Sequence, residues 1–217
     1  QGWVVRVAVI VLAVLSFAGP VRAAPLGTTA ERIARQATFE VVARRPEQDG
    51  LSYERPLPLD LVPYAERQSP YVPIGTAFAI GRNEFVTAAH VLTPSFQSSF
   101  GAPLLRGPDG IVHEFGLVTK YSAHEDFVVF TLKSPPKLRP LAVCRQAVMN
   151  TEVLAVGNAL GGGIVLRDGL LTSTTPEDEA GRWSWLRFSA AASPGNSGGP
   201  LLDPAGCVVG VVVAASP

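Results

Sequence analysis

The sequence has little charge and few of the residues that hold metals. Only 17% of its 217 residues are charged, Lys and Arg (18) balance Asp and Glu (18), and there are three histidines and two cysteines. With no basic cluster to neutralise phosphates, we expect no nucleic-acid partner. Two thiols cannot make a four-ligand zinc site, and no histidine lies at ligand spacing from either, so we expect no metal or other cofactor.

Long segments of helical periodicity are missing after residue 74. Hydrophobic residues make up 47% of the chain, which is typical of a globular protein of one or two domains. The apolar runs are short and are separated by Gly, Pro, Asn and Asp: "GTAFAI", "EFVTAAHVL", "DFVVFTL", "EVLAVG", "IVLRDGLLTS", "WSWLRFSA" and "GCVVGVVV". Many short strands at regular spacing predict an all-β sandwich or barrel.

The N-terminal residues 1–23 have the features of a signal peptide. Residues 4–18 are nearly all apolar, with Arg6 as their one charge, and Val21 and Ala23 supply the small residues of a cleavage site. The apolar run is short for a membrane anchor, which needs about 20 residues. We therefore expect a cleaved export signal and a periplasmic or secreted protein.

The next part of the chain, residues 24–73, is expected to hold a helix, a strand and a long loop. Thr28-Thr29-Ala30-Glu31 has the pattern of a capping box and predicts a helix through about Gln36. The segment "ATFEVVA" is strand-like. Residues 46–73 are rich in proline and polar residues, which favours an insertion or a surface loop.

The strand-like part divides at "KSPPKLRP" (133–140), which we interpret as a linker. The first half would span residues 37–135 and the second residues 136–217. The sequence begins with Gln rather than Met and ends in a strand-like run with no partner after it. We therefore expect the second half to be incomplete at its C-terminal end.

Cys144 and Cys207 can be interpreted in two ways. In an exported chain a disulfide between them would persist. Two buried free thiols are equally compatible with the sequence.

Three polar residues at the ends of strand-like runs carry the candidate chemistry. His90 lies in "FVTAAHVL", Asp126 in "AHEDFVVFTL" and Ser197 in "GNSGGP". Taken singly, each has an ordinary structural explanation: a packed histidine, a turn aspartate, and a loop of Gly, Asn and Ser. His124 and Glu125 beside the aspartate raise the alternative of a metal site, which we set aside because the His-x-Asp pair has no third ligand nearby. The chain order of histidine, aspartate and serine is, however, that of one class of nucleophilic triad.

These motifs resemble those of the trypsin-like (chymotrypsin-fold) serine proteases, and among them the bacterial HtrA/Do-like exported proteases. The likeness runs from about Ile74 to Ala215 and includes "GTAFAIG", "FVTAAHVL", "SAHEDFVVFTL", "VGNALG" and "FSAAASPGNSGGPLLD". Three features depart from the family: "VGNALG" lacks the usual Pro-Phe, Ser193 replaces a frequent Asn, and loop 46–73 differs. The resemblance implies an all-β fold of two six-stranded antiparallel β-barrels with the active site between them.

The resemblance also implies catalytic roles. Ser197 would be the nucleophile, His90 the general base, and Asp126 the residue that orients the imidazole. The oxyanion hole would lie at residues 195–197, where the backbone amides of Gly195 and Ser197 flank Asn196.

The substrate pocket is expected to be apolar. By the same resemblance, Ala191 would lie at its bottom, and Val213, Ala214 and Ala215 would form a wall. None of these residues carries charge, so the side chain that precedes the cleaved bond should be small or apolar.

The sequence therefore predicts an exported serine endopeptidase that cleaves polypeptides through an acyl-enzyme. The alternative is an inactive or weakly active protein of the same fold that binds unfolded polypeptides. An esterase is disfavoured because the chain has no Gly-x-Ser-x-Gly elbow. A homo-oligomer is left open.

Overall fold

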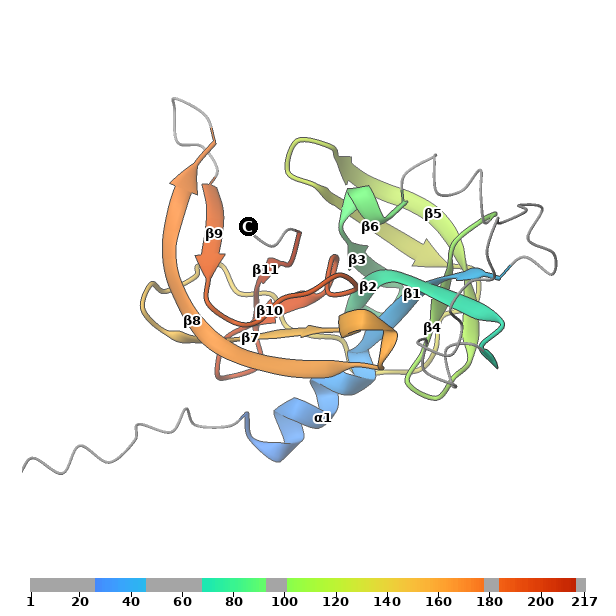
Figure 1. The fold of residues 1–217 in the computed structure, drawn as a ribbon, viewed down its shortest axis with the longest axis horizontal. Helices are drawn as coiled ribbons and strands as arrows, with labels where there is room; N and C mark the ends of the chain where they lie inside the picture. Colours follow the sequence, from blue (N-terminus) through green and yellow to red (C-terminus); the bar gives the residue numbers. More distant parts are fainter. Residues whose placement is uncertain (1–25, 46–67, 93–100, 178–183, 214–217) are drawn as a thin grey trace, which may run out of the picture.

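The computed structural model describes residues 26–45, 68–92, 101–177 and 184–213. The described residues are mostly β, with one α-helix among them packed beneath the sheets in Figure 1. The elements are α1 (Thr28–Ala37), β1 (Thr38–Arg44), β2 (Tyr71–Gly81), β3 (Glu84–Thr87), η2 (Ala89–Leu92), β4 (Leu104–Arg106), β5 (Val112–Ser122), β6 (Phe127–Leu132), β7 (Glu152–Gly157), η3 (Ala159–Gly161), β8 (Val165–Pro176), β9 (Ser184–Phe188), β10 (Pro200–Leu202) and β11 (Val208–Val211). Within the described ranges, no helix is long and apolar enough to cross a membrane.

The first six strands form a closed barrel in the order β1-β2-β3-β6-β5-β4. Aromatic side chains fill its interior. Phe85 stacks on Phe130 with ring centroids 5.9 Å apart and meets Phe39 edge-on at 5.5 Å. Burial of such rings is the largest favourable contribution to a core of this size. The barrel is therefore a rigid base for the loops at its rim.

The last five strands form a curled sheet in the order β11-β10-β7-β8-β9. Strands β9 and β11 are its two edges, and in the described residues neither pairs with a further strand. Figure 1 shows this sheet wrapping beside the first barrel without closing. The predicted fold class of two barrels, the second incomplete, is confirmed.

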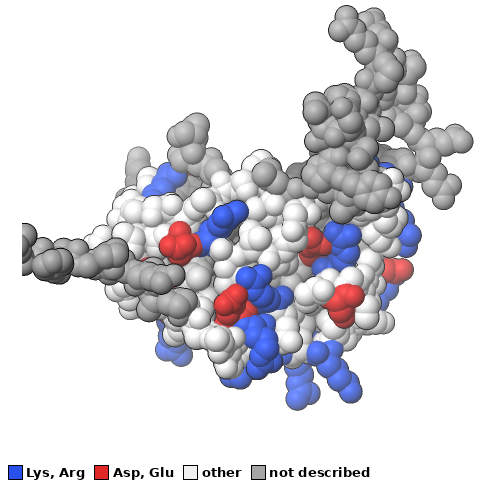
Figure 2. Space-filling model, turned by 60° about the horizontal axis from the view of Figure 1, so that its bottom comes forward, with Lys and Arg blue, Asp and Glu red and all other residues white. Residues whose placement is uncertain are grey.

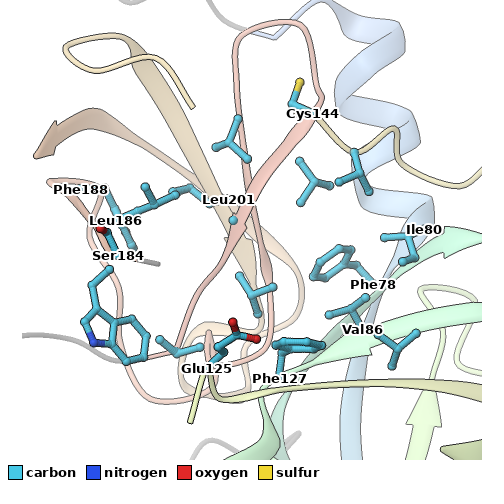
Figure 3. Close-up of a pocket in the computed structure, with 18 of the residues that line it drawn as sticks. Phe78, Ile80, Val86, Glu125, Phe127, Cys144, Ser184, Leu186, Phe188 and Leu201 are labelled. Carbon is cyan, nitrogen blue, oxygen red and sulfur yellow. The ribbon is translucent and has the colours of Figure 1, made fainter. Parts of the chain in front are cut away.

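An apolar pocket of about 510 Å³ lies between the open sheet and the first barrel. Figure 3 shows Phe78, Val86 and Phe127 on one side of it and Leu186 and Phe188 on the other. The pocket is lined by β9 and β11, the two edge strands, and by β2, β3 and β6. Within the described residues, the inner face of the curled sheet thus lines this pocket with apolar side chains.

Charges of both signs are mixed on the surface near α1. Figure 2 shows acidic and basic side chains interspersed over this face. One such pair lies on α1 itself, where Arg35 contacts Glu31 at 2.9 Å with both side chains well exposed. Exposed pairs of this kind contribute little to stability.

A disulfide joins Cys144 to Cys207, with a Cα–Cα distance of 5.6 Å. It decides between the two interpretations of the cysteines. The bridge ties the segment between the barrels to the turn before β11, where the Cys144 amide also donates to the Val208 carbonyl at 2.8 Å. Asp203 lies near both sulfurs, but bonded sulfurs are not thiolate ligands for a metal.

The capping box predicted at Thr28–Glu31 does not form. The N-cap of α1 is Gly27, which has no side chain to cap the helix. Glu31 pairs with Arg35 one turn later instead of reaching back to the helix start. The helix itself lies where the sequence predicted it.

Several strand boundaries also differ from the prediction. The run "EFVTAAHVL" is split, because β3 ends at Thr87 and His90 lies in the short 3-10 helix η2. Residues 71–73, expected in the loop, begin β2. Pro73 is tolerated there because it faces a register shift between Val41 and Val42 of β1. Residues 46–67 of the predicted loop lie outside the described residues.

Candidate active site

The carboxylate of Asp126 and the ring of His90 are in direct contact. The His90 Nδ1 lies 2.6 Å from Asp126 Oδ2, and the His90 backbone amide donates to Asp126 Oδ1 at 2.8 Å. The side chain of Asp126 is 21% exposed and that of His90 is 43% exposed. The aspartate is thus largely enclosed while the imidazole reaches solvent.

The local backbone brings these two residues together. Asp126 precedes β6 and has a φ of 52°, a left-handed conformation that few residues other than Gly adopt. Its carbonyl accepts the Ala89 amide at 3.2 Å. Backbone strain of this kind persists only where surrounding contacts hold it, and it is frequent at functional sites.

Ser197 lies in a tight turn between Gly195 and Gly198, half-buried. Both glycines have positive φ, 99° and 87°. A Cβ on Gly198 would lie 2.2 Å from both the Thr76 carbonyl oxygen and Thr87 Oγ1. The same Cβ would lie 2.9 Å from the nitrogen of Ala88, which is two residues before His90. Only glycine therefore lets this turn pack so closely against the first barrel.

The backbone amides of this turn fall into two groups. Those of Asn196, Gly198 and Gly199 donate to backbone carbonyls at 3.0, 2.7 and 2.9 Å. Those of Gly195 and Ser197 donate no hydrogen bond to any described residue. The two amides expected in the oxyanion hole are thus the ones that remain available, whereas the Asn196 amide is engaged with Ser193.

The predicted pocket residues are only partly described. Ala191 is exposed in the segment after β9, and Val213 is half-buried after β11. Ala214 and Ala215 lie outside the described residues. Ala190, the residue before Ala191, packs closely on β8: a Cβ on Gly169 of that strand would lie 2.2 Å from the Ala190 nitrogen.

Sequence reasoning assigned no role to Thr76 of β2, which makes close contacts with the serine turn. Its side chain is fully buried, and its hydroxyl donates to the Gly195 carbonyl at 2.6 Å. Its amide donates to the Ser197 carbonyl at 2.8 Å. The only sign in the sequence is a single hydroxyl in an apolar run, directly after Gly75.

Residues 75–211 match the family model of the trypsin-like peptidase domain. The chain belongs to the trypsin-like peptidase family. It is 33% identical over 102 residues to "Protease Do-like 1, chloroplastic" of Arabidopsis thaliana, a match that covers 43% of this chain and 23% of that protein. The chain thus aligns with less than a quarter of that relative. The predicted resemblance to trypsin-like and Do-like proteases is confirmed.

The fold is shared with a solved member of this group. A serine endoprotease from Yersinia pestis superimposes with a TM-score of 0.62 and 19% sequence identity, covering 86% of this chain and 57% of that one. At this identity the likeness establishes the fold alone. The family match supports a peptidase function for this chain.

Proposed function

We propose that this trypsin-like peptidase is a serine endopeptidase in which Ser197, His90 and Asp126 form the catalytic triad. The observation that carries the proposal is the 2.6 Å contact between His90 Nδ1 and Asp126 Oδ2. A carboxylate at Nδ1 keeps the proton on that nitrogen, so that Nε2 is free to act as a base.

The reaction proceeds in two halves. Ser197 Oγ bonds to the peptide carbonyl carbon while its proton passes to His90 Nε2, and the carbonyl π electrons move onto oxygen. The amides of Gly195 and Ser197 donate to this oxyanion. The carbonyl then re-forms as the C–N bond breaks, and His90 gives its proton to the leaving amine. Water attacks the acyl-enzyme by the same route and regenerates Ser197.

The substrates would be polypeptides with a small or apolar side chain before the cleaved bond. Support comes from Ala191 and Val213, which bring no charge to the predicted pocket. Export to the periplasm or outside the cell remains part of the proposal. It rests on residues 1–23, which lie outside the described residues.

A chain that only binds unfolded polypeptides is the weaker alternative. Such a protein would have no need to keep the contact between His90 and Asp126 or the available amides of Gly195 and Ser197. Each triad member accounts for orders of magnitude in rate. The presence of all three residue types in the sequence therefore favours the enzyme.

The test compares Ser197→Ala with Ser193→Ala, a serine four residues earlier in the same segment. Ser197→Ala should abolish hydrolysis of casein and labelling by a fluorophosphonate, with an unchanged melting temperature. Ser193→Ala should keep both activities. Cleavage by the Ser197→Ala variant at the parental rate, or a label on another residue, would refute the assignment.

A further inference from the structure

Four hydrogen bonds converge on Thr76, a buried residue of the first barrel. Its amide and hydroxyl donate to the carbonyls of Ser197 and Gly195, at 2.8 and 2.6 Å. Its hydroxyl also accepts the Asn158 amide at 3.0 Å. Its own carbonyl accepts the Thr87 hydroxyl at 2.6 Å. One residue thus connects the first barrel, the β7–β8 connection and the serine turn.

Thr76 holds the two residues whose amides are available to an oxyanion. Ser197 and Gly195 each present a carbonyl to Thr76 and an unengaged amide elsewhere. Each fixed carbonyl lies in one plane with the amide of the next residue, so Thr76 holds the peptide planes that follow Gly195 and Ser197. In a turn this short, held planes on the C-terminal side of both residues limit how far the amides of Gly195 and Ser197 themselves can turn. Oxyanion stabilisation depends on donors that are in place before the reaction.

The Thr76 hydroxyl fits this position because it is hydrogen-bonded to a backbone group on each side. It donates one bond and accepts one, and no solvent reaches it. A Cβ on Gly157 would lie 3.1 Å from Thr76 Oγ1 and 2.9 Å from the Asn196 Cα. The glycine at 157 therefore lets the hydroxyl and the serine turn approach each other.

We infer that the Thr76 hydroxyl is a positioning residue for the oxyanion hole, acting across the interface between the barrels. The inference rests on the proposed function and adds to it a residue outside the triad. Thr76 touches no reacting atom. Its loss should lower kcat more than it raises KM, because misdirected amides weaken stabilisation of the transition state rather than binding of the ground state.

The experiment compares Thr76→Val, Thr76→Ser and the control Thr131→Val. Valine keeps the size and the backbone bond to Ser197 but removes the hydroxyl, whereas serine restores it. Thr131 is a matched control because its hydroxyl also bridges backbone groups, those of Leu117. Active sites are counted by fluorophosphonate titration. Then kcat, KM and the Ki of a peptide aldehyde, whose bound oxygen would occupy the oxyanion hole, are measured.

We expect Thr76→Val to lower kcat by about 10- to 100-fold and to raise the aldehyde Ki in parallel, with KM changed by no more than about twofold. Thr76→Ser and Thr131→Val should stay near the parent. If Thr76→Val does not fold, Thr76→Cys keeps a weak donor and should give an intermediate kcat.

Three results would overturn the inference while leaving the proposed function intact. The first is a parental kcat in Thr76→Val or, if that variant does not fold, in Thr76→Cys. The second is a loss of kcat in Thr131→Val equal to that in Thr76→Val. The third is a kcat in Thr76→Ser as low as that in Thr76→Val. A parent that neither hydrolyses casein nor takes the label would overturn the proposed function, and this inference with it.

Discussion

Both oxygens of the Asp126 carboxylate are bonded to His90. Oδ1 accepts the His90 backbone amide at 2.8 Å, and Oδ2 contacts the ring Nδ1 at 2.6 Å. The carboxylate therefore fixes the position of the histidine main chain and the orientation of its ring at once. In the proposed mechanism, these two functions can be separated by mutation.

Asp126→Asn should lower kcat by about 10³- to 10⁴-fold and leave the fold intact. The amide keeps the shape of the side chain and tolerates the φ of 52°, but it does not hold the required histidine tautomer. Glu125→Gln, at the adjacent carboxylate, is the control and should retain parental kcat. An active Asp126→Asn variant would show that Asp126 does not orient the base.

Activity should be lost in acid, because a general base must be unprotonated to accept the proton of Ser197. The measurement is kcat/KM against pH, with thermal denaturation followed at each pH to exclude unfolding.

EDTA should have no effect on activity, because the proposed steps involve no metal. Loss in EDTA that is restored by zinc would count against the triad mechanism.

Cleavage should follow small or apolar side chains. The predicted base of the pocket is Ala191, which offers no partner for a buried cation. Sites cut in a peptide library would show the preference directly. Ala191→Asp should shift cleavage towards Lys and Arg, whereas Ala102→Asp, on an exposed loop of the first barrel, should not. Cutting mainly after Lys or Arg by the parent would place another residue at the pocket base.

Arg106→Met should destabilise the first barrel by about 2–3 kcal/mol. Arg106 pairs with Glu40, and the two side chains are only 22% and 11% exposed. Removing the guanidinium leaves a buried carboxylate without its cation. Chemical denaturation of the variant and parent measures the difference.

The exposed pair Lys133–Glu114 is the control for Arg106. The hydrogen bond and charge of Lys133 lower the pKa of the Glu114 carboxyl. The contribution of this pair is therefore fully present above the pKa that Glu114 has in the unfolded chain, and it is lost as the pH falls through the lower pKa of the folded chain. Because both side chains are well exposed, Lys133→Met should leave the denaturation midpoint unchanged. Equal effects in the two variants would contradict the argument from burial.

Short apolar runs predicted most of the strands because burial requires them. "GTAFAI" and "DFVVFTL" are buried in the structure as β2 and β6, and such runs can be recognised without tertiary information. Strand β5 was missed although it contains Phe115, Leu117 and Val118, and its side chains are mostly exposed in the structure. Its place is fixed by pairing with β4 and β6.

The candidate site, like the fold, could be predicted from the sequence only in part. His90, Asp126 and Ser197 could be selected because each lies in a distinctive motif. The role inferred for Thr76 could not, since it depends on contacts with Gly195 and Ser197, which are far away in the sequence. No local pattern records such a contact.

The Cys144–Cys207 bridge joins two residues that are 63 positions apart in the sequence. The segment between them contains Ser197 and the β8–β9 connection. A cut in the polypeptide anywhere between the two cysteines would therefore leave both pieces covalently joined. A protease that nicks its own surface loops in this interval would run as one band on a non-reducing gel and separate only after reduction. Purity judged without reductant would overlook such damage.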